Sequence, residues 1–227
     1  MSWSTRIGFN APFDKVAELT RAERPLIIAI HGLPGCGKSY TLDKLSHILP
    51  SKQYLFFETS TILSKLSRGI ERFENANAEQ KMALRAATVQ EIARECTVVD
   101  KAGIVSGFPY LSDERHAEGA QDIDTPIDCS RYSCVLFLHV PVQVLIERRM
   151  LGAGTTGRKH LHSVPIAEIN LLQQWQDTEC ERLSKVCEEG GVAFERIDMG
   201  KVSFAEIADL VRGVKRDWES KEEAKKE

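Results

Sequence analysis

The sequence has no excess of basic residues, no paired-cysteine motif and no long apolar run. Its 30 Lys and Arg stand against 33 Asp and Glu, a formal net charge of -3, so no surface is marked for neutralising a nucleic-acid backbone. The 6 cysteines fall at scattered spacings without a CxxC pair, which is typical of free thiols in a reducing compartment. No stretch approaches the roughly 18 apolar residues that a membrane span needs. We therefore expect a cytoplasmic protein without nucleic-acid or membrane partners.

Length and composition favour one globular α/β domain. The hydrophobic fraction of 42% and the charged fraction of 28% are ordinary for folded proteins and argue against a disordered chain. A chain of 227 residues suffices for one large domain and is short for two. We expect a single domain over residues 1–219 and a charged tail over residues 220–227. The sequence leaves open whether the protein is a monomer or a homodimer.

Five short apolar runs alternate with segments of helical periodicity. Continuous apolar runs rich in β-branched residues are typical of strands buried on both faces of a parallel sheet. Alternating strands and helices predict such a sheet with helices on both faces and ligands at the carboxyl ends of the strands. The predicted strands are residues 26–30, 54–57, 103–107, 134–140 and 192–198, and the predicted helices include residues 14–23, 38–49, 78–96 and a long one opened by Pro165. Residues 111–131 show little periodicity and are expected to form a surface loop.

The strongest motif is GxxxxGK[ST], which lies between the first apolar run and the next helical segment. This context separates a phosphate-binding loop from a chance match. Gly32, Gly35 and Gly37 permit backbone angles that side chains forbid, so successive amides can point at a phosphate. Lys38 would reach the β and γ oxygens, and the Ser39 hydroxyl suits magnesium. We expect ATP with Mg²⁺ to bind through Gly32, Leu33, Pro34, Gly35, Cys36, Gly37, Lys38, Ser39 and Tyr40.

A phosphate-binding loop does not by itself name a reaction, because several classes of protein share it. A GTPase needs a guanine-reading NKxD motif, which is absent. The DxxG match at residues 100–103 precedes a predicted strand, whereas in a GTPase it follows one. A small-molecule kinase, a regulatory nucleotide-binding module and a simple nucleotide hydrolase remain as alternatives.

Several segments resemble the nucleoside and nucleotide kinases of the adenylate-kinase type. Gly107-Phe108-Pro109 follows the third predicted strand, where that family carries DGFPR. Residues 58–63 resemble the passage that opens the acceptor site, and Val140-Pro141 with Glu147-Arg148-Arg149 resembles the strand and arginines that lead into the lid. The similarity covers most of residues 24–215. It implies a three-layer P-loop NTPase fold that is adenylate-kinase-like.

The resemblance also implies an organisation and an activity. It places a helical acceptor-binding insert over residues 59–100 and a short lid over residues 150–164. The activity implied is transfer of the γ-phosphoryl group of ATP to a nucleoside or a nucleoside monophosphate. Such a transfer needs cationic clamps, for which the candidates are Arg148, Arg149 and Arg158 beside Lys38. Alternatively, the arginines have no role in phosphate binding, because the helix dipole favours a cation at a helix C-terminus in any case.

Two positions depart from the family pattern. Ser106 replaces the aspartate that normally holds the water shell of magnesium, and Tyr110 replaces the arginine that normally binds an acceptor phosphate. Both changes favour an unphosphorylated acceptor. Glu58, at the end of the second predicted strand, is the candidate catalytic carboxylate and a magnesium ligand with Ser39. Alternatively, Glu58 caps the helix that follows it.

A fainter similarity, in residues 98–103 and in the helix from Trp175 to Gly191, is to P-loop kinase-like proteins of fungi. Neither stretch carries a motif of known chemistry. By residue type, Trp175 is expected to pack its helix against the sheet instead of contacting a ligand.

Overall fold

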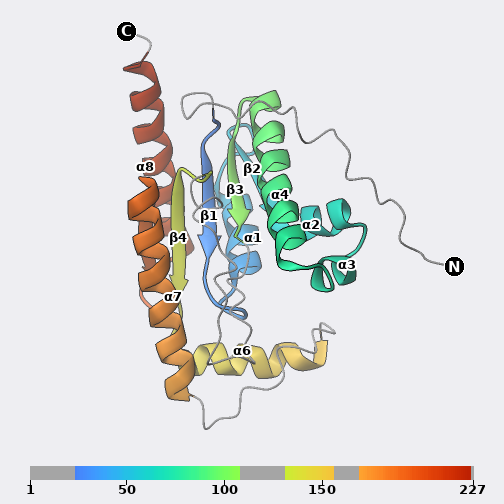
Figure 1. The fold of residues 1–227 in the computed structure, drawn as a ribbon. Coiled ribbons are helices and arrows are strands. Elements are labelled where there is room, and N and C mark those ends of the chain that lie inside the picture. The colour runs from blue at the N-terminus through green and yellow to red at the C-terminus, as the bar shows by residue number, and fades with distance from the viewer. Residues whose placement is uncertain (1–23, 108–130, 156–168, 226–227) are drawn as a thin grey trace, which may run out of the picture.

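The computed structural model describes residues 24–107, 131–155 and 169–225. These residues contain one five-stranded parallel sheet with the strand order β2-β3-β1-β4-β5 (Figure 1). The predicted fold class and all five predicted strands are confirmed, with end points shifted by at most one residue. The strands are β1 (Ile27–His31), β2 (Tyr54–Glu58), β3 (Ala102–Ser106), β4 (Cys134–His139) and β5 (Ala193–Asp198).

Helices cover both faces of this sheet. On the face formed by Ile28 and Ile30 lie α1 and α8, whereas α4 and the middle of α7 cover the face formed by Ile27 and Ala29. Figure 1 shows α6 crossing the end of the sheet to which the strand arrows point. The helices are α1 (Lys38–Ile48), α2 (Thr59–Ser67), α3 (Ile70–Glu74), α4 (Ala78–Val99), α6 (Val142–Thr155), α7 (Ile169–Gly190) and α8 (Phe204–Glu223).

Three predicted boundaries change in the structure. Helix α6 continues through Thr155, so the first part of the predicted lid is helical. Helix α8 continues through Glu223, so the predicted tail begins as a helix. Helix α4 ends at Val99 and carries a capping box at Asn77. The predicted leading helix over residues 14–23, most of the surface loop, the rest of the lid and Pro165 lie outside the described residues.

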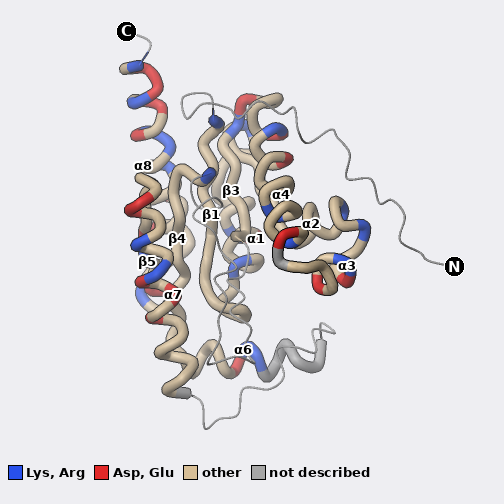
Figure 2. Tube along the Cα trace, in the orientation of Figure 1, with Lys and Arg blue, Asp and Glu red and all other residues tan. Residues whose placement is uncertain are grey.

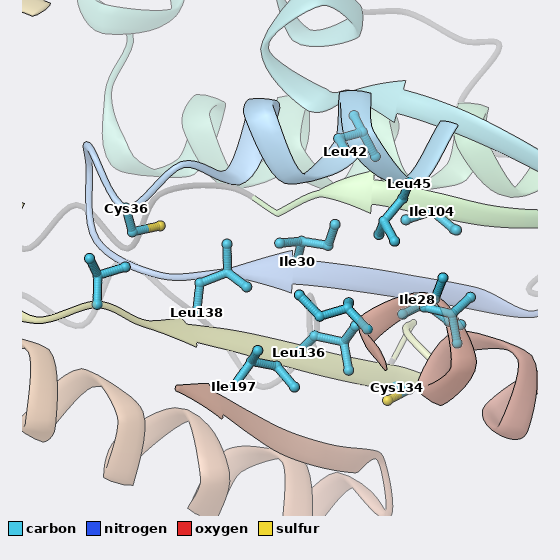
Figure 3. Packing of buried hydrophobic residues seen from close by; sticks show 14 of the residues in the cluster. Ile28, Ile30, Cys36, Leu42, Leu45, Ile104, Cys134, Leu136, Leu138 and Ile197 are labelled. Carbon is cyan, nitrogen blue, oxygen red and sulfur yellow. The ribbon is translucent and has the colours of Figure 1, made fainter. Parts of the chain in front are cut away.

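The core is apolar because the central strands are apolar on both faces. No Lys, Arg, Asp or Glu occurs in β1, β3 or β4, and the charged residues in Figure 2 lie mainly on the helices. Figure 3 shows Ile28 and Ile30 of β1 packed with Leu136 and Leu138 of β4. Burial of apolar surface contributes roughly 25 cal/mol of stabilising free energy per Å². Because both faces of the central strands are buried, the sheet is stable and holds the loops at its carboxyl end in place.

The strand register brings four chain segments to one edge of the sheet. Ser106 pairs with Ile30 of β1 on one side and with Glu58 of β2 on the other. His31 pairs with Phe137 of β4. All strands are parallel, so the loop after β1, Glu58 and the end of β3 lie on the same side.

Among the helices that the structure describes, none is both long and apolar enough to cross a lipid bilayer.

Candidate active site

The loop between β1 and α1 has the backbone of a phosphate cradle. Gly32, Gly35 and Gly37 adopt φ values of 141°, 88° and 100°, which side chains disfavour. A Cβ on Gly32 would lie 2.7 Å from Cys36 Sγ and 2.8 Å from the Leu138 carbonyl oxygen. Gly37 is the N-cap of α1, and no side chain caps that end. The first amides of α1 therefore keep the ability to bind an anion.

Lys38 folds back over this loop. Its amino group donates hydrogen bonds to the carbonyl oxygens of Gly32 at 2.7 Å and Leu33 at 3.2 Å, and it lies 3.9 Å from Cys36 Sγ. The Cys36 side chain is fully buried in the core, as Figure 3 shows. The ammonium group is therefore held beside the cradle by the same short segment that forms it.

Two adjacent arginines of α6 contact the loop in different ways. Arg148 is exposed and donates from Nη1 to the Cys36 carbonyl oxygen at 2.8 Å. Arg149 is only 3% exposed, donates from Nε to the Pro34 carbonyl oxygen at 3.0 Å, and lies 5.6 Å from the centre of the Trp175 ring. The structure thus brings both predicted arginines to the loop. Arg158 lies outside the described residues.

A second polar group forms where β2 and β3 end. The Ser106 hydroxyl donates to Glu58 Oε2 at 2.8 Å and accepts from the Thr59 amide at 3.2 Å. The Thr59 hydroxyl donates to the Ser106 carbonyl oxygen at 2.5 Å. Glu58 occupies the N-cap position of α2, but its side chain makes no capping hydrogen bond. The Glu58 charge therefore lies where the α2 dipole favours an anion, while the Ser106 hydroxyl orients the carboxylate.

His31, which sequence reasoning did not single out, lies between these two groups. Its ring is 5% exposed, and Nε2 has no hydrogen-bond partner among the described residues. Burial, followed by the positive charge of Lys38, lowers the pKa of His31 from 6.5 to about 3, so the ring is neutral near pH 7. A Cβ on Gly107 would lie 2.3 Å from Nε2, so this ring requires glycine there. The sequence signal was a histidine ending an otherwise apolar strand.

The donor set fits magnesium better than a transition metal. Within the described ranges, no group of three or more His, Cys, Asp or Glu side chains could hold a metal ion. Magnesium needs few protein ligands, because it keeps several waters and binds phosphate oxygens. The exposed Ser39 hydroxyl and the half-buried Glu58 carboxylate are hard oxygen donors at the required edge of the sheet.

Comparison with known proteins gives a family match. The model of an AAA domain matches residues 31–163, a segment that begins at the last residue of β1 and includes the phosphate loop, β2, β3 and β4. No curated protein matches the chain.

Two solved structures illustrate the overall similarity. One is a candidate kinase from Chloroflexus aurantiacus j-10-fl, with 14% identity, a TM-score of 0.47, and coverage of 83% of this chain and 97% of that one. The other is shikimate kinase from Acinetobacter baumannii in complex with shikimate, with 13% identity, a TM-score of 0.49, and coverage of 85% and 94%.

Proposed function

The chain belongs to the AAA domain family. We propose that it is an ATP-dependent phosphotransferase acting on a small-molecule acceptor. The matched segment contains the GxxxxGK[ST] motif. The proposal is supported chiefly by the arrangement at one sheet edge, where the phosphate cradle with its lysine follows β1, Ser106 ends the adjacent strand β3, and the carboxylate that Ser106 orients ends β2. A nucleoside or nucleoside monophosphate is the acceptor class proposed.

The nucleotide side of the site supplies positive charge. The β-phosphate would bind the loop amides at the N-terminus of α1, and Lys38 would exchange the Gly32 and Leu33 carbonyl oxygens for β and γ oxygens. Arg148, being exposed, can leave the Cys36 carbonyl and approach the transferring phosphoryl group. Arg149 is buried against the loop, so we assign it to holding Pro34 in place. Arg158 remains a proposed clamp from the lid.

The acceptor side supplies the base. In the proposed step, the acceptor hydroxyl oxygen bonds to the γ-phosphorus, its proton passes to Glu58, and the bond between the γ-phosphorus and the β–γ bridging oxygen breaks to release ADP. Ser106 donates to Oε2, which fixes the plane of the carboxylate before the acceptor binds. An aspartate at position 106 would place a second carboxylate against Glu58, and the repulsion would disfavour two ionised groups.

Magnesium would be held by Ser39 and Glu58 together with phosphate oxygens. The metal, when bound, supplies positive charge that offsets the charge developing on the β and γ oxygens. Strand spacing puts Glu58, two strands from β1, on the order of 10 Å from the end of β1. Its contact with the metal would therefore run through a bound water.

The acceptor class can be tested directly. ADP release would be measured with ATP and Mg²⁺ against a panel of nucleosides, nucleoside monophosphates and small alcohols including shikimate. A phosphotransferase shows turnover that depends on one acceptor class, and the phosphorylated product is identified by mass spectrometry. Ser106 and Tyr110 replace charged family residues. We therefore expect a higher rate of ADP release with nucleosides than with nucleoside monophosphates. ADP release at the same rate with and without every acceptor would refute the proposal in favour of a hydrolase.

A further inference from the structure

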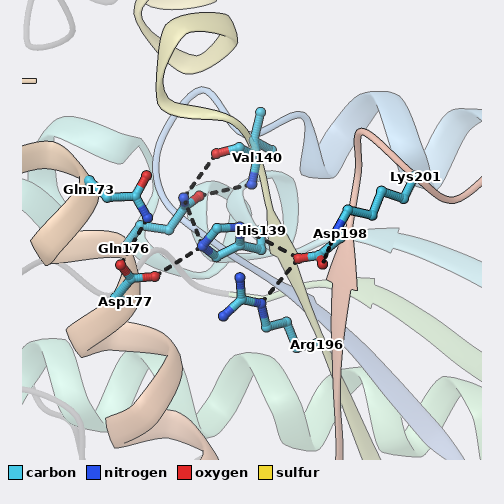
Figure 4. Close-up of polar contacts among 8 residues, drawn as sticks. All are labelled: His139, Val140, Gln173, Gln176, Asp177, Arg196, Asp198 and Lys201. Atoms are coloured by element: carbon cyan, nitrogen blue, oxygen red, sulfur yellow. Dashed lines mark hydrogen bonds and ion pairs between the residues drawn. The ribbon is translucent and has the colours of Figure 1, made fainter.

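Two consecutive residues of α7, Gln176 and Asp177, hold the corner between β4 and α6 (Figure 4), and Trp175 directly precedes them. Gln176 is wholly buried; its side chain accepts from the Val140 amide at 3.0 Å and donates to the Val140 carbonyl oxygen at 2.9 Å. Asp177 Oδ1 lies 3.0 Å from His139 Nε2. The third residue, Trp175, packs against the core from the same helix. Side chains of α7 thus fix the last residue of β4 and the one that follows it.

This corner leads directly to the phosphate loop. Helix α6 begins two residues after Val140 and carries Arg149, whose Cγ would lie 3.1 Å from a Cβ on Gly35. The guanidinium group of Arg149 has the Trp175 ring at 5.6 Å and the Pro34 carbonyl oxygen as a hydrogen-bond acceptor. A continuous set of contacts therefore runs from α7 through Arg149 to the middle of the phosphate loop. None of these α7 residues belongs to a motif that binds phosphate.

We propose that Trp175, Gln176 and Asp177 are positioning residues for the phosphate loop, acting through Arg149 and the β4–α6 corner to set its affinity for nucleotide. A glycine-rich loop has large conformational freedom, and a loop already held in its binding conformation loses less entropy when a ligand binds. The buried amide of Gln176 fixes where α6 starts, and the ring of Trp175 fixes where the Arg149 guanidinium lies. The inference rests on the proposed function only in taking the loop's ligand to be a nucleotide.

A double-mutant cycle tests the coupling. Trp175→Leu should weaken ADP binding, measured by isothermal titration calorimetry, by about threefold to tenfold, as expected for a desolvated cation–π contact. In an Arg149→Met background the same change should have little further effect, because the residue through which it acts is gone. Trp175→Phe, which keeps a ring, should restore most of the affinity. Trp218→Leu is the matched control: that tryptophan of α8 also packs on the core, so its loss should lower stability and leave ADP affinity unchanged.

Equal losses of affinity from Trp175→Leu in both backgrounds, or wild-type affinity in a folded Trp175→Leu protein, would overturn the proposal. If Trp175→Leu does not fold, a spectroscopic measurement decides. In a Trp3→Phe, Trp218→Phe protein, Trp175 is the one remaining tryptophan. ADP should change its emission, and the change should disappear with Arg149→Met; unchanged emission despite ADP binding would overturn the proposal. Absence of ADP binding by the wild type would instead refute the proposed function.

Discussion

The nucleotide side and the acceptor side of the candidate site are built in opposite ways. On the nucleotide side, the residues from Gly32 to Ser39 are contiguous, and Lys38 bonds to carbonyl groups only five and six positions away. On the acceptor side, Ser106 and Glu58 are 48 positions apart and meet because β2 and β3 pair in a particular register. The first group is organised by local backbone geometry, whereas the second depends on the sheet.

This difference has a consequence for how each side tolerates change. A one-residue slip between β2 and β3 would move every side chain of one strand to the opposite face and separate Ser106 from Glu58, yet would leave the phosphate loop intact. The acceptor side therefore depends on strand register, whereas the phosphate loop depends on its own backbone and on the α6 and α7 side chains that hold it.

The largest expected effect is the loss of turnover when the positive charge of Lys38 is removed from the nucleotide side. Lys38→Ala should lower acceptor-dependent turnover by at least about a hundredfold, because a preorganised cation at the developing charge is lost. Far-ultraviolet circular dichroism should remain that of the wild type, since among the described residues the hydrogen bonds of Lys38 stay within its own loop. Lys52→Ala, at an exposed position between α1 and β2, is the matched control and should keep full turnover. Retained activity in Lys38→Ala would contradict the assignment of the nucleotide side.

Removing the carboxylate should affect the acceptor side alone. Glu58→Gln keeps the shape and the Ser106 contact but cannot take a proton, so kcat should fall about a hundredfold or more while the Kd for ATP analogues stays within about twofold. Glu74→Gln, at the exposed end of α3, is the control. Equal losses of kcat and of ATP affinity would mean that the two sides do not act separately.

His31 lies between the two sides and should make stability depend on pH. Its pKa is about 3 in the folded protein and 6.5 when exposed, so the unfolded chain binds more protons between these values. Stability should be constant above pH 6.5 and fall by up to about 1.4 kcal/mol per unit below it, a loss of about 2 to 3 kcal/mol by pH 4.5. Asp177, whose pKa is lowered from 3.8 because Gln173 donates a hydrogen bond to it, contributes only below that window.

Urea unfolding between pH 7.5 and pH 4.5 measures this dependence. His31→Gln should flatten the curve between pH 6.5 and pH 4.5, whereas His47→Gln, at an exposed histidine of α1, should keep the slope of the wild type. An unchanged slope in His31→Gln would show that the buried ring does not remain neutral.

The smallest expected effect concerns the hydroxyl that orients the carboxylate. Ser106→Ala removes the hydrogen bond to Glu58 and should reduce kcat about tenfold, which corresponds to one charge-assisted hydrogen bond. Ser106→Thr retains the hydroxyl and should recover most of the rate. If both variants have wild-type kcat and KM, the orientation of Glu58 by Ser106 is irrelevant to turnover.

Much of this protein could be predicted from local sequence. The runs at β1 and β4 are continuously apolar because both strands are buried on both faces. The phosphate loop can be identified from the spacing of its glycines and from Lys38 and Ser39, which follow them. The alternatives left open for Glu58 and for Arg149 could not be resolved in that way. Their contacts are with Ser106 and with Pro34 and Trp175, residues far along the chain.

By itself, the sequence determined the α/β class, the five strands and the phosphate loop, because periodicity, burial and glycine torsions act over a few neighbouring residues. Tertiary structure alone decided that Ser106 orients Glu58, that His31 is a buried neutral ring against Gly107, and that α7 reaches the loop through Arg149. These contacts depend on strand register and helix packing, which bring residues together whatever their separation along the chain.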